Sequence, residues 1–242
     1  MKLIKRIYSI YGLIIFLGYY ICSHPFIVLF LKLNKKPAVH WLIKSWGHVV
    51  TNTLGLHVHR IKKFEGDFPE KAIYCANHTS YFDIPCLFVT APEKFTIVGK
   101  AELNKVPLFG YMFQRMYIPV NRRSAKGRYE TYKKAINAID EGKSVIFYPE
   151  GTIPRDAGPT LHRFKDGPFK LAIEKQIPVV PVTIPYNWII LPDNRRYLLT
   201  NHRCEVIYHQ PIPTEGLSVE DLPSLKEKTF DVIQKELNEK NK

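Results

Sequence analysis

Cysteine is scarce in this chain of 242 residues, and the spacing of its cysteines excludes several classes of protein. Cys22, Cys75, Cys86 and Cys204 form no Cys-x-x-Cys pair and no zinc spacing, so free thiols are expected rather than a disulfide framework. The sequence also lacks a His-Glu-x-x-His motif, so no bound metal is expected. No Gly-x-Ser-x-Gly segment is present, which argues against a serine nucleophile on an α/β-hydrolase turn.

Acidic residues are also few, because 22 aspartates and glutamates stand against 35 lysines and arginines, a formal net charge of +13. Nucleic acid, an anionic membrane surface and phosphate-bearing substrates are candidate partners, and a soluble basic surface is the alternative without a partner. The basic residues are scattered rather than gathered in an aromatic-rich stripe, so no nucleic acid is expected. An apolar content of 45% suits one domain of moderate size plus an appendage.

The longest apolar stretch lies near the N-terminus. It covers residues 7–22, is interrupted by Ser23-His24-Pro25, continues over residues 26–33, and has basic residues on both flanks. The first run is somewhat shorter than the roughly 20 apolar residues of a membrane span, and no signal-peptide cleavage site follows it. Because proline interrupts helical hydrogen bonding, the sequence predicts a pair of helices that turns at residues 23–25, enters one leaflet and returns. A single tilted span is the alternative.

In the rest of the chain, apolar runs that are typical of strands alternate with helical patterns. This order predicts an α/β fold with a largely parallel mixed sheet flanked by helices. Residues 1–55 are expected to form a membrane-associated helical segment, and residues 56–242 the α/β domain. Helices are expected over residues 41–54, 129–139 and 222–237, and strands over residues 56–61, 73–76, 95–98, 116–120, 144–148, 179–184 and 205–208.

The heptapeptide Asn77-His78-Thr79-Ser80-Tyr81-Phe82-Asp83 follows the predicted strand 73–76. On a regular helix, five positions would place His78 and Asp83 roughly 140° apart, so a contact between them needs a turn. With a turn at Thr79, Asp83 would hold the Nδ1 proton of His78 and leave Nε2 as a base. The alternative is a capping box, in which Ser80 and Asp83 only stabilise the start of a helix.

Several blocks of sequence in the same order resemble the lysophosphatidic acid acyltransferase family, the membrane glycerolipid acyltransferases with a His-x4-Asp motif. The resemblance covers roughly residues 70–185 and agrees with the hydrophobic N-terminus. Two positions depart from the family pattern near its phosphate site, since Ile153 replaces an arginine and Asn121 an aspartate. Besides the heptapeptide, the blocks are Gly99-Lys100-x-Glu102-Leu103, Pro107-x-x-Gly110, Ile118-Pro119-Val120-Asn121-Arg122, Tyr148-Pro149-Glu150-Gly151-Thr152, Phe164-Lys165-x-Gly167-x-Phe169 and Val180-Pro181-Val182.

The resemblance implies an enzyme that moves a fatty acyl group to the free hydroxyl of lysophosphatidic acid and gives phosphatidic acid in phospholipid biosynthesis. Acyl-CoA or acyl carrier protein would be the donor, with no further cofactor, and membrane lipids would be the other partners. The expected location is the membrane, at the cytoplasmic face of the bacterial inner membrane. Another lysolipid, such as a lyso-aminolipid, or glycerol 3-phosphate remains open as the acceptor, and a non-enzymatic basic membrane-binding module is the alternative of a different class.

By the same resemblance, His78 is the expected general base and Asp83 orients it. The substrate-binding residues are expected to be Lys100, Arg122, Glu150, Gly151 and Thr152. A bare carboxylate would repel phosphate, so Glu150 is expected to orient Thr152 and the basic groups. Backbone N–H groups near Gly151 are expected to stabilise the oxyanion.

Overall fold

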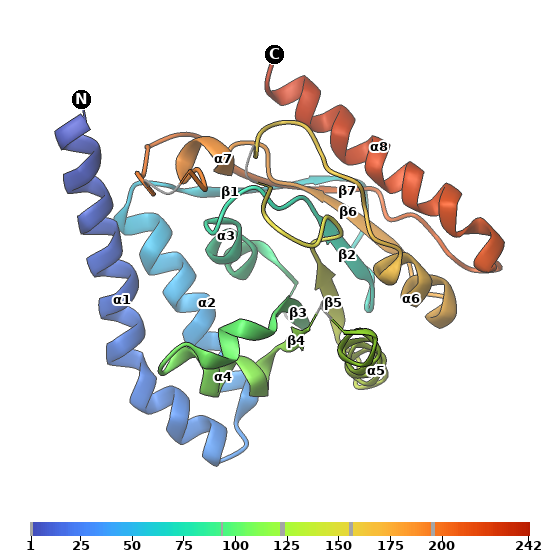
Figure 1. The fold of residues 1–242 in the computed structure, drawn as a ribbon, viewed down its shortest axis with the longest axis horizontal. Helices are drawn as coiled ribbons and strands as arrows, with labels where there is room; N and C mark the ends of the chain where they lie inside the picture. The colour runs from blue at the N-terminus through green and yellow to red at the C-terminus, as the bar shows by residue number, and fades with distance from the viewer. Residues whose placement is uncertain (1, 93, 122–123, 155–156, 195–196) are drawn as a thin grey trace.

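The computed structural model describes residues 2–92, 94–121, 124–154, 157–194 and 197–242 (Figure 1). Neighbouring strands of the sheet run parallel, except that β6 and β7 are antiparallel. This arrangement confirms the predicted α/β fold, and each of the seven predicted strands is found with its ends within two residues. The order across the sheet is β1 (Val58–Lys63), β7 (Cys204–His209), β6 (Val179–Thr183), β2 (Ile73–Ala76), β5 (Ser144–Phe147), β3 (Phe95–Lys100) and β4 (Ile118–Val120).

Helices cover both faces of the sheet (Figure 1). The three helices predicted from sequence periodicity correspond to α2, α5 and α8. The helices are α1 (Lys2–Lys32), α2 (Lys36–Thr53), α3 (Asp83–Thr90), α4 (Phe109–Met116), α5 (Ala125–Asp140), α6 (Gly167–Lys175), α7 (Asn187–Ile190) and α8 (Leu222–Lys240), with short 3-10 helices η1 (Ala101–Lys105) and η2 (Val219–Asp221).

Alternation along the central strands builds two hydrophobic cores. In β2, Tyr74 and Ala76 belong to the core that includes residues of α2, α3 and α4, whereas Ile73 and Cys75 belong to the core formed with α5, α6 and α8. Successive side chains of a strand point to opposite faces, so one short run supplies both cores. All four residues of β2 are buried, as expected for a parallel strand covered on both sides.

The helix pair predicted over residues 7–22 and 26–33 is one continuous helix in the structure, and the helix predicted over residues 41–54 packs against it as α2. Helix α1 continues through Pro25 for 31 residues, so the predicted turn at residues 23–25 is wrong. The chain turns at residues 33–35 instead, where Asn34 has a φ of +55°. Pro37 then lies in the first turn of α2, where a missing N–H costs nothing. Pro25 removes one helical hydrogen bond, and α1 stays helical on both sides of that loss.

Helix α1 packs on the rest of the protein along one side. The indole Nε1 of Trp46 donates to the carbonyl of Phe16 at 3.2 Å, and the two rings meet edge to face at 4.8 Å. Near the start of α1, the Tyr8 hydroxyl donates to the carbonyl of Leu54 at 2.6 Å. The two N-terminal helices therefore share a core with the sheet, and a domain boundary at residue 55 stays a prediction.

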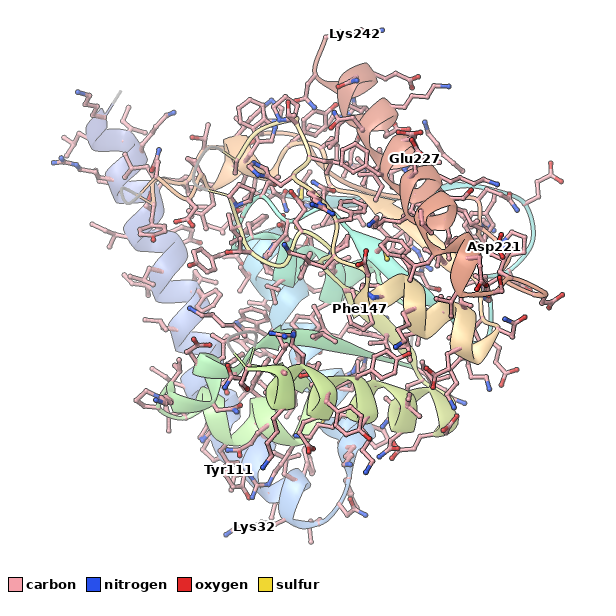
Figure 2. The ribbon with its side chains drawn as sticks, turned by 45° about the vertical axis from the view of Figure 1, so that its right-hand side comes forward. Lys32, Tyr111, Phe147, Asp221, Glu227 and Lys242 are labelled. Carbon is pink, nitrogen blue, oxygen red and sulfur yellow. The ribbon has the colours of Figure 1, made fainter. Side chains whose placement is uncertain are left out.

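The other side of α1 is apolar and exposed. In Figure 2 its side chains project away from the body of the protein, with Lys32 at the end of the helix. By length and composition, α1 is able to cross a membrane. An exposed apolar face of this length suits association with a membrane. Its large exposed residues include Leu3, Ile4, Ile7, Ile10, Leu13, Ile14, Leu17 and Ile21.

Candidate active site

The candidate residues lie where parallel strands end at one edge of the sheet. The carboxyl ends of β6, β2, β5, β3 and β4 follow one another across this edge. His78 follows β2, the turn with Glu150 follows β5, and Lys100 is the last residue of β3. In open α/β sheets, ligands bind at the carboxyl ends of the strands, so the topology alone brings these segments to a plausible binding edge.

His78 and Asp83 meet across a turn. The Nδ1 atom of His78 lies 2.9 Å from Oδ2 of Asp83, and the side chains are 15% and 0% exposed. The segment 77–82 is not helical, which allows the imidazole to fold back onto the carboxylate. Among the described residues, no group bonds to Nε2 of His78, so this nitrogen is available to a substrate. The geometry required by the sequence hypothesis is thus present, and the catalytic role of each residue stays a prediction.

The carboxylate of Asp83 accepts four hydrogen bonds although it is fully buried. Besides His78, Oδ2 accepts the backbone N–H groups of Thr79 at 2.9 Å and Ser80 at 3.0 Å. The other oxygen, Oδ1, accepts Nδ2 of Asn187 at 2.8 Å. Four donors compensate for the water that a buried carboxylate has lost. Asp83 is also the first residue of α3, where the helix dipole favours a negative charge.

The capping interpretation and the catalytic one therefore concern the same carboxylate. Half of a capping box is present, because Asp83 accepts the Ser80 N–H, but the Ser80 hydroxyl accepts the N–H of Phe82 at 3.0 Å rather than that of Asp83. The same hydroxyl donates to the carbonyl of Leu191 at 2.7 Å. Capping fixes the turn, and the fixed turn presents His78.

Glu150 ties two segments of backbone together. Its Oε1 accepts the N–H of His78 at 2.9 Å, and its Oε2 accepts the N–H of His162 at 2.9 Å. The residue is 6% exposed, and burial raises the pKa of its carboxyl group, against the lowering effect of the two backbone donors. The expectation that Glu150 orients Thr152 is wrong, since both carboxylate oxygens bond to backbone elsewhere. Glu150 instead positions the backbone that carries His78.

Gly151 and Thr152 form the outer part of this turn. Gly151 has a φ of +83°, a conformation that glycine adopts without steric cost. Its N–H donates to the carbonyl of Tyr148 at 2.9 Å, within the turn, and an oxyanion role of the backbone N–H groups near Gly151 stays a prediction. Thr152 is exposed, and its hydroxyl has only a long contact of 3.4 Å to the carbonyl of Ile153. The hydroxyl of Thr152 is thus open to a ligand.

Lys100, one of the two expected phosphate-binding cations, lies further along the same edge. Lys100 is exposed at the end of β3, and its Nζ lies 3.9 Å from Oε1 of Glu102. A long ion pair between exposed groups is weak, so it leaves Lys100 free to reorient toward an anion. Arg122 follows β4 and lies outside the described residues.

Comparison with known proteins agrees with this arrangement. Residues 55–185, more than half of the chain, match the family described as Acyltransferase. The chain belongs to the acyltransferase family. The resemblance inferred from the sequence blocks is confirmed.

Two curated relatives of this acyltransferase are both named 1-acyl-sn-glycerol-3-phosphate acyltransferase. The chloroplastic 1-acyl-sn-glycerol-3-phosphate acyltransferase BAT2 of Brassica napus is 29% identical over 199 residues, which are 79% of this chain and 55% of the relative. The 1-acyl-sn-glycerol-3-phosphate acyltransferase of Haemophilus influenzae is 27% identical over 212 residues, 85% of this chain and 84% of the relative. The chain spans about half the length of the plant relatives that it matches.

A solved structure shows that the acyltransferase fold extends over the whole chain. The crystal structure of the 1-acyl-sn-glycerophosphate (LPA) acyltransferase PlsC from Thermotoga maritima superposes with a TM-score of 0.80. The sequences are 23% identical, and the match covers 99% of this chain and 97% of the other. The helix pair α1 and α2 thus belongs to the shared fold.

Sequence reasoning missed the roles of two asparagines that hold the candidate site. Asn187, the first residue of α7, bonds to Asp83 and is fully buried. Asn77 exchanges two hydrogen bonds with the backbone of Ile184, since its Nδ2 donates to the carbonyl at 3.0 Å and its Oδ1 accepts the N–H at 2.7 Å. Both join the turn after β2 to the segment after β6. For Asn77, the available signal was its position directly after the predicted strand 73–76.

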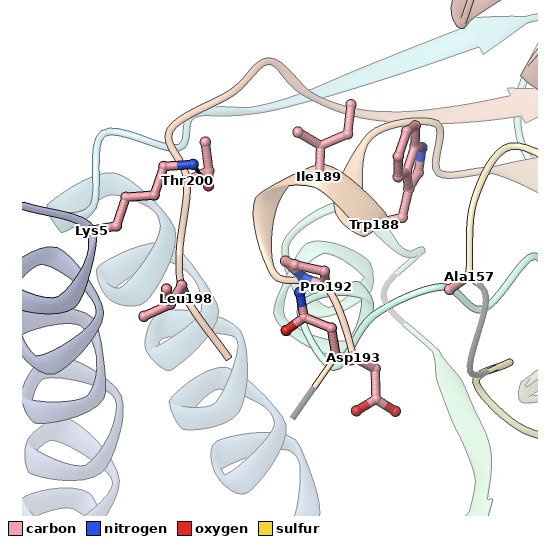
Figure 3. Close-up of a pocket in the computed structure, with 9 residues that line it drawn as sticks. Lys5, Ala157, Trp188, Ile189, Pro192, Asp193, Leu198 and Thr200 are labelled. Carbon is pink, nitrogen blue, oxygen red and sulfur yellow. Dashed lines mark hydrogen bonds between the residues drawn. The ribbon is translucent and has the colours of Figure 1, made fainter. Parts of the chain in front are cut away.

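A cavity of about 490 Å³ is lined by residues of α1, of α7 and of the segment that follows α7 (Figure 3). None of the predicted site residues that the structure describes lines the cavity. The cavity is connected to the site through Leu191, whose carbonyl accepts the Ser80 hydroxyl and whose next residue, Pro192, is part of the cavity wall. In Figure 3, Lys5 reaches from α1 to Thr200, with Nζ 3.1 Å from the hydroxyl oxygen. The walls are Lys5, Ala157, Trp188, Ile189, Pro192, Asp193, Asn194, Leu198 and Thr200.

Proposed function

We propose that this protein is an O-acyltransferase that moves a fatty acyl group from a thioester to the free hydroxyl of lysophosphatidic acid. The product is phosphatidic acid, and the donor is acyl-CoA or acyl carrier protein. The observation that carries the proposal is the contact of 2.9 Å between His78 Nδ1 and Asp83 Oδ2. Family membership and the names of the relatives support it.

His78 acts as the general base in this mechanism. An alcohol is a poor nucleophile until it loses its proton, and histidine is suited to remove that proton near neutral pH. Nε2 takes the proton while the alcohol oxygen attacks the thioester carbonyl carbon. The buried Asp83 carboxylate holds Nδ1 and stabilises the imidazolium that forms. When the tetrahedral intermediate collapses, the carbon–sulfur bond breaks, and the leaving sulfur receives the proton from Nε2.

The acceptor's phosphate calls for cationic groups at the same edge of the sheet. Lys100 is exposed there, and Arg122 follows the neighbouring strand β4 in the sequence. Arginine binds phosphate with two parallel N–H groups, whereas lysine acts as a point charge. The exposed hydroxyl of Thr152 is a further donor to the acceptor. The net charge of +13 favours an anionic substrate in general.

A second acceptor class follows from two positions of the sequence. In the family pattern that the sequence blocks resemble, an arginine and an aspartate are expected where this chain has Ile153 and Asn121. These altered neighbours of the phosphate-binding block leave another lysolipid, such as a lyso-aminolipid, or glycerol 3-phosphate as the second candidate acceptor. Acyl transfer by His78 is the same for each of these acceptors.

The proposed location is the membrane, at the cytoplasmic face of the bacterial inner membrane. The exposed apolar side of α1 supports insertion of the helix pair into one leaflet. Both substrates of the proposed reaction carry long acyl chains, so a site close to the bilayer shortens their path. The four cysteines are free thiols, which suits a reducing compartment.

The direct test is the His78→Ala variant in purified protein. We expect the turnover number for acyl transfer to fall by roughly 10³- to 10⁴-fold, because the base that deprotonates the alcohol is lost. His59→Ala is the matched control, since His59 is exposed on β1 and distant in the sheet order from the site. Retained turnover in folded His78→Ala protein would remove His78 from the mechanism.

The acceptor is tested with a panel of lipids and a labelled thioester donor. Lysophosphatidate, glycerol 3-phosphate and a zwitterionic lysolipid are offered in turn, with acyl-CoA or acyl carrier protein as the donor. The proposal expects the highest kcat/KM with lysophosphatidate. A higher value with a lyso-aminolipid would assign the second acceptor class.

A further inference from the structure

The ring of Tyr148 lies flat against the imidazole of His78. The two ring centroids are 3.8 Å apart, and the ring planes differ by 15°. Tyr148 is buried and comes directly after β5, the strand that pairs with β2. Stacked rings at this distance are in van der Waals contact, so Tyr148 blocks rotation of the imidazole toward its own side.

The same turn that carries Tyr148 also holds the backbone of His78. Gly151 donates its N–H to the Tyr148 carbonyl, and Lys165 donates its N–H to the Pro149 carbonyl at 2.8 Å. Two residues after Tyr148, the Glu150 carboxylate accepts the His78 N–H. One rigid turn therefore fixes both the backbone and the ring plane of the same histidine. The contact with Asp83 then needs to set only how the imidazole ring is rotated within that plane.

Stacking on an aromatic face affects the two protonation states of an imidazole differently. A cation over the face of an aromatic ring is stabilised by the ring quadrupole, by roughly 0.5–2 kcal/mol according to how far it is desolvated. Neutral imidazole lacks this attraction. The Tyr148 face thus favours the imidazolium, which is the form that His78 takes when it removes a proton.

The hydroxyl group of Tyr148 has no comparable role. It is buried, and within the described part of the chain it has no hydrogen-bond partner. Burial raises the pKa of the Tyr148 hydroxyl well above its ordinary value, with the Asp83 carboxylate as a further cause, so the phenol stays neutral. A buried hydroxyl without a partner costs free energy, and its removal leaves the stacked ring unchanged.

We propose that Tyr148 is a positioning residue whose aromatic face holds the His78 imidazole toward Asp83 and stabilises the imidazolium formed during acyl transfer. The proposal rests on the proposed role of His78 as the base. It assigns the function to the ring and none to the hydroxyl. Phenylalanine is therefore an adequate replacement at position 148, and an aliphatic residue of similar size is not.

The experiment compares Tyr148→Phe with Tyr148→Leu and Tyr148→Met in the full-length protein. We expect Tyr148→Phe to keep kcat within about 2-fold of the parent. The two aliphatic variants should lower kcat by roughly 3- to 30-fold with little change in either KM, which corresponds to the loss of a cation–aromatic contact at 1.4 kcal/mol per factor of ten. Methionine is included because its flexible chain fills a gap that leucine does not.

The pH profile separates this role from a merely structural one. Without the aromatic face the imidazolium is less stable, so the acid limb of kcat/KM should move to lower pH by about 0.4 to 1.5 units in the aliphatic variants and stay in place in Tyr148→Phe. A histidine-selective NMR titration measures the same shift without turnover, and His78→Ala identifies the resonance of His78.

Each outcome has one reading. If Tyr148→Phe loses as much activity as the aliphatic variants, the hydroxyl acts and the proposal is overturned. It is equally overturned if the His78 titration is the same in the parent, Tyr148→Leu and Tyr148→Met. If the titration shifts as expected while His78→Ala retains full turnover, the contact between the rings stands and the proposed function fails instead.

Discussion

Replacement of Asn187 by leucine tests whether the support behind Asp83 matters for both stability and turnover. Asn187 is fully buried, and its Nδ2 donates to Asp83 Oδ1 at 2.8 Å and lies 3.5 Å from the Cys86 sulfur. Leucine has the branched shape of asparagine, with two methyl groups in place of the amide oxygen and NH2 group, so the main effect is the loss of the donor rather than a cavity. The carboxylate oxygen Oδ1 is then left buried with no hydrogen bond.

The magnitude follows from the charge of the acceptor. A hydrogen bond to a charged group is worth about 1.5–3 kcal/mol, against about 1 kcal/mol for a bond between neutral groups. We therefore expect Asn187→Leu to lower the free energy of unfolding by about 1.5–3 kcal/mol. Because Asp83 also orients His78, we expect kcat to fall by roughly 10-fold, the equivalent of 1.4 kcal/mol in the transition state.

Thr90→Val is the matched control. Thr90 is buried in the same helix α3, and its hydroxyl bonds to neutral partners, the carbonyl of Cys86 at 2.9 Å and the hydroxyl of Tyr208 at 3.0 Å. We expect this variant to lose about 1 kcal/mol of stability and to keep its kcat. Both variants are followed by urea unfolding with tryptophan fluorescence and by acyl transfer at saturating substrate. Equal stability and equal kcat in Asn187→Leu and Thr90→Val would refute the reasoning.

Two further predictions concern groups whose charge is disfavoured by burial. In Glu150→Gln, one of the two carboxylate oxygens becomes an NH2 group, so either the His78 N–H or the His162 N–H loses its acceptor. We expect unfolding experiments to show that the free energy of unfolding falls by about 1–3 kcal/mol. Burial lowers the pKa of His209 to about 4, and the nearby Glu236 carboxylate opposes this shift only in part. As the pH falls through 6.5, the imidazole of His209 therefore takes up a proton in the unfolded chain but not in the folded protein. Stability should therefore fall by about 2 kcal/mol between pH 7 and pH 5 through this group, and His209→Gln should remove that part of the slope whereas His59→Gln should not.

The strands were predictable because their signals are local. Alternation of apolar residues, bounded by proline, glycine and polar residues, marks each strand within a few positions. The segment 73–76 is an example, with the polar heptapeptide directly after it. The parallel arrangement followed from the alternation of strands with helices, which leaves few other ways to bury both faces.

The error at the N-terminus shows the limit of a single local signal. Pro25 alone suggested a turn, but a proline inside a long helix costs one hydrogen bond, and packing of the flanking turns outweighs it. Tyr20, before Pro25, packs against the core, and Ile27, after Pro25, is part of it. These contacts hold both halves of α1 in place. At the true turn, three signals coincide: Asn34, two lysines and Pro37. Several weak signals together are stronger evidence than one strong residue.

The contacts of Asn187 and Tyr148 were not predictable, because they depend on strand order and register. The sequence places Tyr148 seventy positions from His78, and no spacing rule relates them. In the sheet, Cys75 pairs with Phe147 and Ala76 pairs with Val182. The residues after these pairs leave the sheet at one edge, on either side of the turn that carries His78.

This register gives a physical reason for the arrangement of the whole site. β2 is flanked by β5 and β6, so the turn after β2 is held from both sides: the residues after β5 stack on the imidazole and bond its backbone, and those after β6 bond the carboxylate. A shift of one residue in either pairing would turn these side chains to the opposite face of the sheet. The contact between His78 and Asp83 thus depends on the parallel pairing of β2 with β5 and with β6. The two hydrophobic cores fix both pairings without a substrate.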